Sequence, residues 1–157
     1  MPSSVAHAAL QTVPLDQSSD AFLKKWLEQD VVYIITDEEK ASFKRLTTDD
    51  ERYQFIESFW LRRDPSPDTI ENETRNEHYR RIAYSNERFA SGKLGWKTDR
   101  GRIYITLGPP DQIEAHPSGD GRSGPFEIWI YQAGSALKAT SERTLEFDGP
   151  DYKLREK

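Results

Sequence analysis

Residues 95–107 read GWKTDRGRIYITL, and within this stretch the spacing of apolar residues changes. Upstream of it, apolar residues recur at helical spacing. After Gly101, the apolar residues Ile103, Ile105 and Leu107 alternate with Arg102, Tyr104 and Thr106. A period of two is typical of a half-buried strand. The stretch therefore predicts helices first and strands after, an α+β chain rather than a doubly wound sheet.

The strand pattern continues to the end of the sequence. Residues 126–131 (FEIWIY) alternate, and so do Leu145 and Phe147. Residues 148–151 (DGPD) predict a turn into Tyr152 and Leu154. With residues 102–107 as the first strand, we expect the N-terminal helices to pack on a small C-terminal antiparallel sheet, a meander of three to four strands.

Two of the expected helices begin at capping boxes, in which a Thr side chain and a Glu three residues later satisfy free backbone amides. Thr36 with Glu39 predicts a short helix to Leu46. Thr48 with Glu51 predicts a stronger one, ending near residue 63 because residue 64 precedes a proline. Its expected buried positions are Tyr53, Phe55, Ile56, Phe59 and Trp60.

Other segments flank these two helices. A helix from Asp20 carries an apolar stripe, and residues 31–35 (VVYII) predict a short strand, with a helix through them as the alternative. The longest helix is expected over residues 70–90. Its predicted inner face consists of Tyr79, Ile82, Ala83, Asn86 and Phe89.

Composition bounds the function. The chain has 157 residues, 31% charged and 35% apolar, with four Trp, seven Tyr and seven Phe, so its core must be rich in rings. The lack of cysteine excludes disulfides and thiolate metal sites. A net charge of −5 without a basic excess argues against nucleic acid as a partner. No apolar run approaches the roughly 20 residues that span a bilayer, so no membrane insertion is expected.

The chain is expected to form one domain over residues 20–157. Residues 1–19 are small and polar, and we interpret them as a disordered lead-in or the remnant of a trimmed export signal, because Ala6-His7-Ala8 has the form of a signal-peptidase site.

Charged residues are dense at three predicted turns. Two cations and an acid end one helix, a second group enters the sheet, and an acid leaves its first strand. Such a set forms either a structural ion network or a cleft for an anion. The residues concerned are Arg62, Arg63, Asp64, Asp99, Arg100, Arg102 and Asp111.

Metal and nucleophile motifs are missing. The three histidines lie in no metal-binding frame, no phosphate-binding loop is present, and no cofactor is expected. What remains is acid–base chemistry by carboxylates and histidines. The candidate catalytic residues are Glu73, His78, Asp99, Asp111 and His116.

Residues 95–99 read G-W-x-T-D, and the chain resembles the GWxTD domain family of bacterial proteins. Further likenesses are residues 60–67 (WLRRDPSP), 108–111 (GPPD) and 126–129 (FEIW). The resemblance extends in order from about residue 22 to residue 154. It implies export from the cytoplasm, but no established activity, cofactor or catalytic residue. The segment between Gly119 and Phe126 is shorter than in some members.

Two functions follow as hypotheses. The favoured one is a non-catalytic binding domain, outside the cytoplasm, that takes an unknown protein or anionic ligand at the helix–sheet junction. The alternative is a hydrolase or lyase acting on an anionic or saccharide substrate. The expected binding surface consists of Arg62, Arg63, Asp64, Trp96, Thr98, Asp99, Arg100 and Asp111.

Overall fold

The computed structural model describes residues 15–134 and 141–155, with side chains from residue 20 onwards. The α+β order is confirmed, since five α-helices precede four strands in this part of the chain. The helices are α2 (Leu15–Lys25), α3 (Asp37–Lys44), α4 (Asp49–Arg62), α5 (Glu73–Arg88) and α6 (Asp99–Leu107). The strands are β1 (Gln112–His116), β2 (Phe126–Tyr131), β3 (Arg143–Asp148) and β4 (Lys153–Leu154).

The chain divides into two compact units, Met1–Asn72 and Glu73–Lys157. The expectation of a single domain over residues 20–157 stays a prediction. The proposed lead-in, residues 1–19, falls mostly outside the described residues, and α2 already begins at Leu15.

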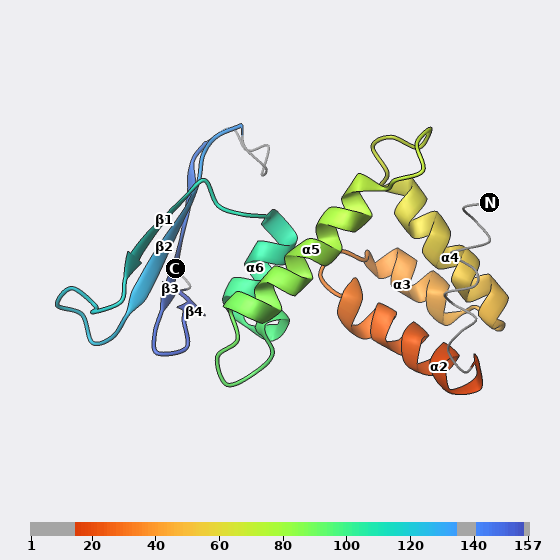
Figure 1. The fold of residues 1–157 in the computed structure, drawn as a ribbon, viewed down its shortest axis with the longest axis horizontal. Coiled ribbons are helices and arrows are strands. Elements are labelled where there is room, and N and C mark those ends of the chain that lie inside the picture. Colours follow the sequence, from red (N-terminus) through yellow and green to blue (C-terminus); the bar gives the residue numbers. More distant parts are fainter. Residues whose placement is uncertain (1–14, 135–140, 156–157) are drawn as a thin grey trace. The chain divides into compact units, whose positions relative to one another are not determined.

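The first unit is a group of helices (Figure 1). A cluster of rings lies between them. Trp26 lies in a π-helical turn, Trp26–Asp30, that continues α2. Its ring meets Phe43 of α3 at 5.5 Å and Phe59 of α4 at 5.1 Å between centroids. Phe55 of α4 contacts both Trp26 and Phe43. Aromatic contacts thus join all three helices of this unit.

Both capping boxes are confirmed. The Thr36 hydroxyl accepts from the Glu39 amide, and the Glu39 carboxylate accepts from the Thr36 amide. Thr48 and Glu51 are paired in the same way at the start of α4. Of the positions predicted to be buried in α4, Phe59 and Trp60 are buried, while Tyr53, Phe55 and Ile56 are half-buried.

The strand predicted at residues 31–35 is wrong. Val31 is buried at the end of the π-helical turn, and its carbonyl accepts from the amides of Ile34 (2.9 Å) and Ile35 (2.8 Å). These local bonds close a turn, so the amides of Ile34 and Ile35 are unavailable for pairing with a neighbouring strand.

The second unit contains a four-stranded antiparallel sheet in the order β1-β2-β3-β4, which confirms the meander. Helix α6 packs with α5 and with β4 (Figure 1). The core consists of rings and one isoleucine from α6, with the sheet supplying most of it. Its buried members are Phe89, Ile103, Trp129, Tyr131 and Phe147.

Residues 102–107, predicted as the first strand, belong instead to α6. Ile103 and Ile105 are both buried because the helix is covered on more than one side. Burial of residues two apart therefore imitates the alternation of a strand. The true first strand is β1, which the sequence analysis did not predict.

The inner face of α5 also differs from the prediction. The helix begins at Glu73, not at residue 70, and Phe89, which follows it, is buried as expected. Ala83 and Asn86 are exposed, whereas His78 and Ser85 are buried. The buried stripe is rotated because Gly95 packs directly against the backbone of Ser85.

Candidate functional site

Two glycines let three chain segments of the second unit meet backbone to backbone. A Cβ added to Gly95 would lie 1.8 Å from the Ser85 carbonyl oxygen on α5. A Cβ added to Gly101 of α6 would lie 1.9 Å from the Gly95 carbonyl oxygen. No side chain fits at either distance, so glycine is required at both positions.

Thr98 joins these two glycines through its buried hydroxyl. The hydroxyl donates to the Gly95 carbonyl (2.7 Å) and accepts from the Gly101 amide (3.0 Å). Thr98 is therefore the N-cap of α6 and also fixes the preceding 3₁₀ turn, Gly95–Lys97. Both hydrogen-bonding capacities of the hydroxyl are used inside the fold.

Asp99 and Arg100 connect the start of α6 to the sheet. The Asp99 carboxylate accepts from the Leu154 amide of β4 at 2.7 Å. Arg100 donates to the Glu127 carboxylate of β2 at 3.2 Å, and its side chain is only 11% exposed. The guanidinium also lies against the rings of Phe89 and Tyr152, at 5.0 and 4.0 Å from their centroids. The charged groups of Asp99 and Arg100 thus both bind partners within the second unit.

Trp96 is partly accessible. Its backbone amide donates to the Asn86 side chain of α5 at 2.9 Å, and its ring is half-buried. The Lys97 ammonium lies 5.4 Å from the centre of the ring. Trp96 thus presents part of an aromatic surface while its backbone is anchored.

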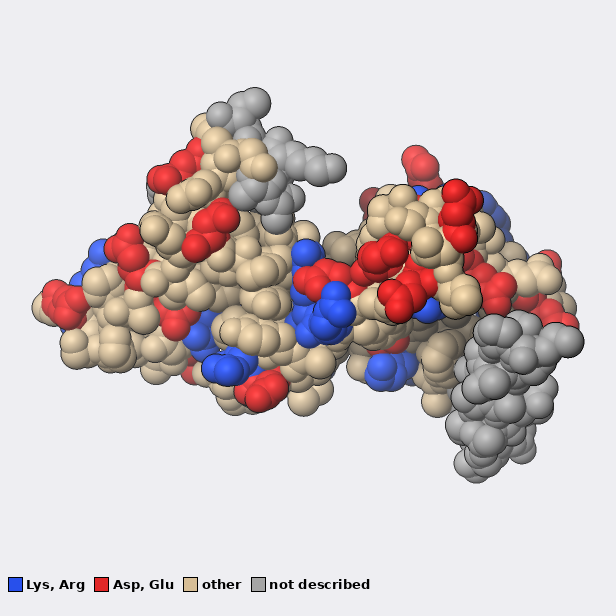
Figure 2. All heavy atoms as spheres, turned by 45° about the horizontal axis from the view of Figure 1, so that its top comes forward, with Lys and Arg blue, Asp and Glu red and all other residues tan. Residues whose placement is uncertain are grey.

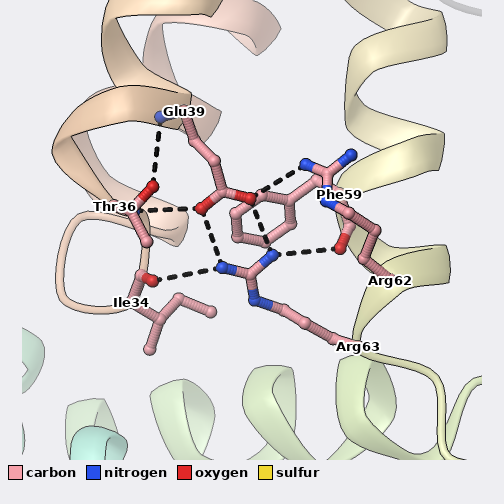
Figure 3. A network of polar contacts seen from close by, with 6 residues as sticks. All are labelled: Ile34, Thr36, Glu39, Phe59, Arg62 and Arg63. Carbon is pink, nitrogen blue, oxygen red and sulfur yellow. Dashed lines mark hydrogen bonds and ion pairs between the residues drawn. The ribbon is translucent and has the colours of Figure 1, made fainter.

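Arg62 and Arg63 belong to the first unit, where both bind Glu39 (Figure 3). Arg63 grips the carboxylate with both guanidinium nitrogens, at 2.8 and 2.9 Å. It also donates to the carbonyls of Phe59 and Ile34 and lies 3.7 Å from the Phe59 ring centre. The hydrogen bonds from Arg63 hold the pKa of Glu39 well below its usual range. Arg63 thus acts as a structural clamp between helices α3 and α4.

The remaining predicted residues have local partners. Asp64 accepts from the Ser66 amide, and Asp111 accepts from the Gln132 amide at 2.8 Å. Arg102 lies 3.8 Å from Asp99. Apart from that contact, the ion-pair partners of the predicted arginines are Glu39 and Glu127, which the sequence analysis did not single out. Both come from distant parts of the sequence and carry no motif.

Of the predicted acid–base residues, Glu73 is exposed at the start of α5, and His78 is buried beside Tyr79. His116 is stacked on Phe126 and bonded through Nδ1 to Asp120, which the sequence analysis did not select. The hydrogen bond from His116 lowers the pKa of Asp120. Ser118 donates to Asp120 and not to the imidazole, so the group lacks the order of a nucleophilic triad.

A carboxyl pair lies on β3 near the same end of the sheet. Burial raises the pKa of Asp148, and so does its hydrogen bond with Glu146. Burial opposes ionisation of Glu146 as well, but Asp148, Arg122 and Arg155 bond to it and lower its pKa. Two carboxyls with opposite shifts are an arrangement that acid–base enzymes use.

An open groove of about 420 Å³ lies on α5 and α6. Tyr84 and Tyr104 stack along it, with centroids 4.6 Å apart and planes at 13°. Glu77 bridges Arg80 and Arg81 at 2.9 Å each. The residues that line the groove are Glu77, Arg80, Arg81, Ala83, Tyr84, Glu87 and Tyr104. None of the five predicted acid–base residues is among them.

Sequence reasoning missed this groove. The i,i+4 spacing of Glu77 and Arg81 indicates an ion pair on a helix, but the sequence predicts residues 102–107, which include Tyr104, as a strand. Only a helix at residues 99–107 brings the Tyr104 ring onto Tyr84. Burial raises the pKa of Tyr104, with Tyr84 and Glu77 adding to the effect.

On the face drawn in Figure 2, basic and acidic side chains are interspersed over both units. Within the described residues, no group of three His, Asp or Glu side chains is arranged to hold a metal ion. The helices of residues 15–134 and 141–155 include none with the length and apolar character of a membrane span.

The sequence comparisons agree with the motif. The family model of the GWxTD domain matches residues 17–156, nearly the whole chain and both units. Neither the curated proteins nor the solved structures contain a match to the chain.

Proposed function

We propose that this chain, which belongs to the GWxTD domain family, is a non-catalytic binding domain of an exported bacterial protein. The GWxTD segment builds the junction of helices and sheet, and a groove on α5 and α6 receives the ligand. The observation that carries this proposal is that Thr98, Asp99 and Arg100 are all bonded within the unit, whereas other residues of the same two helices line an open groove.

The lining of the groove indicates the kind of ligand. Stacked tyrosines offer an aromatic surface with hydroxyls, and guanidinium groups offer fixed donors. The two arginines of the lining are balanced by two glutamates. A mixed polar and aromatic ligand, such as a segment of another protein, satisfies this lining better than a bare anion, which would meet both carboxylates.

The test uses the exported fraction of the source bacterium. The immobilised chain captures proteins, which are identified, purified and titrated back by calorimetry. We expect Tyr84→Ala and Arg80→Ala to weaken the reconstituted binding at least tenfold while the fold, followed by circular dichroism, is unchanged. The matched control Arg45→Ala, on the exposed end of α3, should bind as the parent does. Equal binding by all three variants would refute the proposal that the groove binds the ligand.

A second function has two observations in its favour. The His116–Asp120 pair and the Glu146–Asp148 pair could supply acid–base groups for a hydrolase or lyase on an anionic or saccharide substrate. A panel of phosphate, carboxylate and glycoside chromogenic substrates tests it. Turnover that disappears in Asp148→Asn would support this alternative over the binding domain.

A further inference from the structure

Strand β1 lies at one edge of the sheet of the second unit. It pairs with β2 on one side, and on the other side no described residue forms a ladder with it. In an antiparallel sheet, alternate amide and carbonyl groups of an edge strand point away from the neighbouring strand. β1 therefore offers a row of backbone donors and acceptors.

The edge is open along most of its length. Residues 112–115 are exposed and His116 is half-buried, so no described helix or loop covers the strand. Proteins commonly protect such an edge with proline or lysine, and β1 has neither. Ile113, half of whose surface is exposed, adds an apolar contact.

The charge of the edge favours one kind of partner. The register sets Glu114 opposite Ile128 of β2, which is opposite Glu146 of β3. Glu146 is neutralised by Arg122 and Arg155, but Glu114 forms no ion pair within the described residues. An exposed carboxylate without a counterion thus stands at the middle of the free edge.

We propose that β1 receives an extended segment of a partner protein, which adds a fifth strand to the sheet. The segment carries lysine or arginine opposite Glu114 and β-branched apolar residues beside Ile113. A second copy of this chain is a poorer occupant, because antiparallel pairing centred on Glu114 sets two carboxylates directly opposite each other. This surface shares no residue with the groove lining, so it extends the proposed function and can be tested apart from it.

The probe is a fluorescent nine-residue peptide of alternating valine and lysine. One control replaces lysine by glutamate, and the other has N-methylated backbone amides, which keep the side chains but cannot form a ladder. We expect the lysine peptide to bind about threefold more tightly than the glutamate peptide and the N-methylated peptide not to bind, and amide exchange of residues 112–116 to slow when the lysine peptide is bound. The opposite result, equal binding of the N-methylated peptide, would mean attraction of charge without strand addition and would overturn the proposal.

Two charge-reversal variants test whether the peptide binds at β1. Glu114→Lys should weaken binding of the lysine peptide about threefold, as expected for one cross-strand charge pair, and should favour the glutamate peptide. Glu57→Lys makes the same change of charge on the exposed side of α4 and should leave both affinities unchanged. Equal losses of affinity in Glu114→Lys and Glu57→Lys would contradict the proposal that the peptide binds at β1. So would a Glu114→Gln variant that dimerises on gel filtration while the parent binds no peptide, since Glu114 would then only prevent self-association.

Discussion

The two units hold their helices together by different means. In the first unit the contacts are between side chains, namely the rings around Trp26 and the grip of Arg63 on Glu39. In the second unit the decisive contacts are between backbones, at Gly95 and Gly101. Side-chain contacts can be replaced by others of similar size and charge, whereas a backbone contact leaves no room for replacement. The comparison explains why the recognisable motif lies in the second unit.

Gly95→Ala should have the largest effect on stability. The new methyl group would overlap the Ser85 carbonyl, so α5 and the 3₁₀ turn must separate, and we expect a loss of about 3 kcal/mol or more in the free energy of unfolding. Urea denaturation followed by tryptophan fluorescence measures it. Gly124→Ala is the control, since the nearest atom to its Cβ is 3.6 Å away. Similar losses in both variants would contradict the close-contact explanation.

Thr98→Val should have the next largest effect. The change keeps the shape of the side chain but leaves the Gly101 amide without its buried partner, and the Gly95 carbonyl keeps only the backbone amide of residue 98, at a cost of about 2 kcal/mol. Thermal unfolding of Thr98→Ser, which restores the hydroxyl, should recover most of the stability. If valine is tolerated, the cap does not hold the junction.

Glu39→Gln tests the first unit through pH. The folded pKa of Glu39 lies below its ordinary value of 4.5, so ionisation of Glu39 stabilises the fold above about pH 4.5, and that stabilisation is lost as the pH falls further. The variant should be less stable at neutral pH by about 1.5 kcal/mol and should lose less on acidification. Urea midpoints measured from pH 7 to pH 3 decide the matter. Parallel curves for the two proteins would show that the clamp is unimportant.

Arg80→Gln should be almost neutral. Arg80 is 71% exposed in its side chain, and an exposed ion pair contributes at most about 0.5 kcal/mol. Thermal unfolding should therefore match the parent, which makes Arg80 a suitable position for probing ligand binding. A larger loss would mean that the Glu77 bridge stabilises the groove itself.

The sequence predicted best what local chemistry decides. Both capping boxes need only residues three positions apart, and both helices begin where these boxes predict. The strand at residues 126–131 and the turn after β3 follow from equally local patterns. The failures at residues 31–35 and 102–107 concern β-branched segments, whose state depends on neighbours that are distant in sequence.

The candidate site was predicted only in part. Thr98 and Asp99 of the GWxTD segment are among the predicted binding residues, and the structure gives each a contact within the unit, whereas the close packing of Gly95 on Ser85 was not predicted. Their partners could not be selected, because Ser85 and Leu154 contribute backbone groups that any residue carries. The ion-pair partners of the predicted arginines could not be identified either. The sequence contains many glutamates, and no pattern indicates that Glu39 and Glu127 are the ones that bind arginine.

The bond between Asp99 and the Leu154 amide has a consequence for the order of folding. It joins residues 55 positions apart, so the start of α6 is fully held only after β4 has docked. A closure over so long a separation is slow and comes late, because the intervening chain must be ordered first. During synthesis, α6 would emerge well before β4 and wait, capped by Thr98 alone, for the strand that completes it.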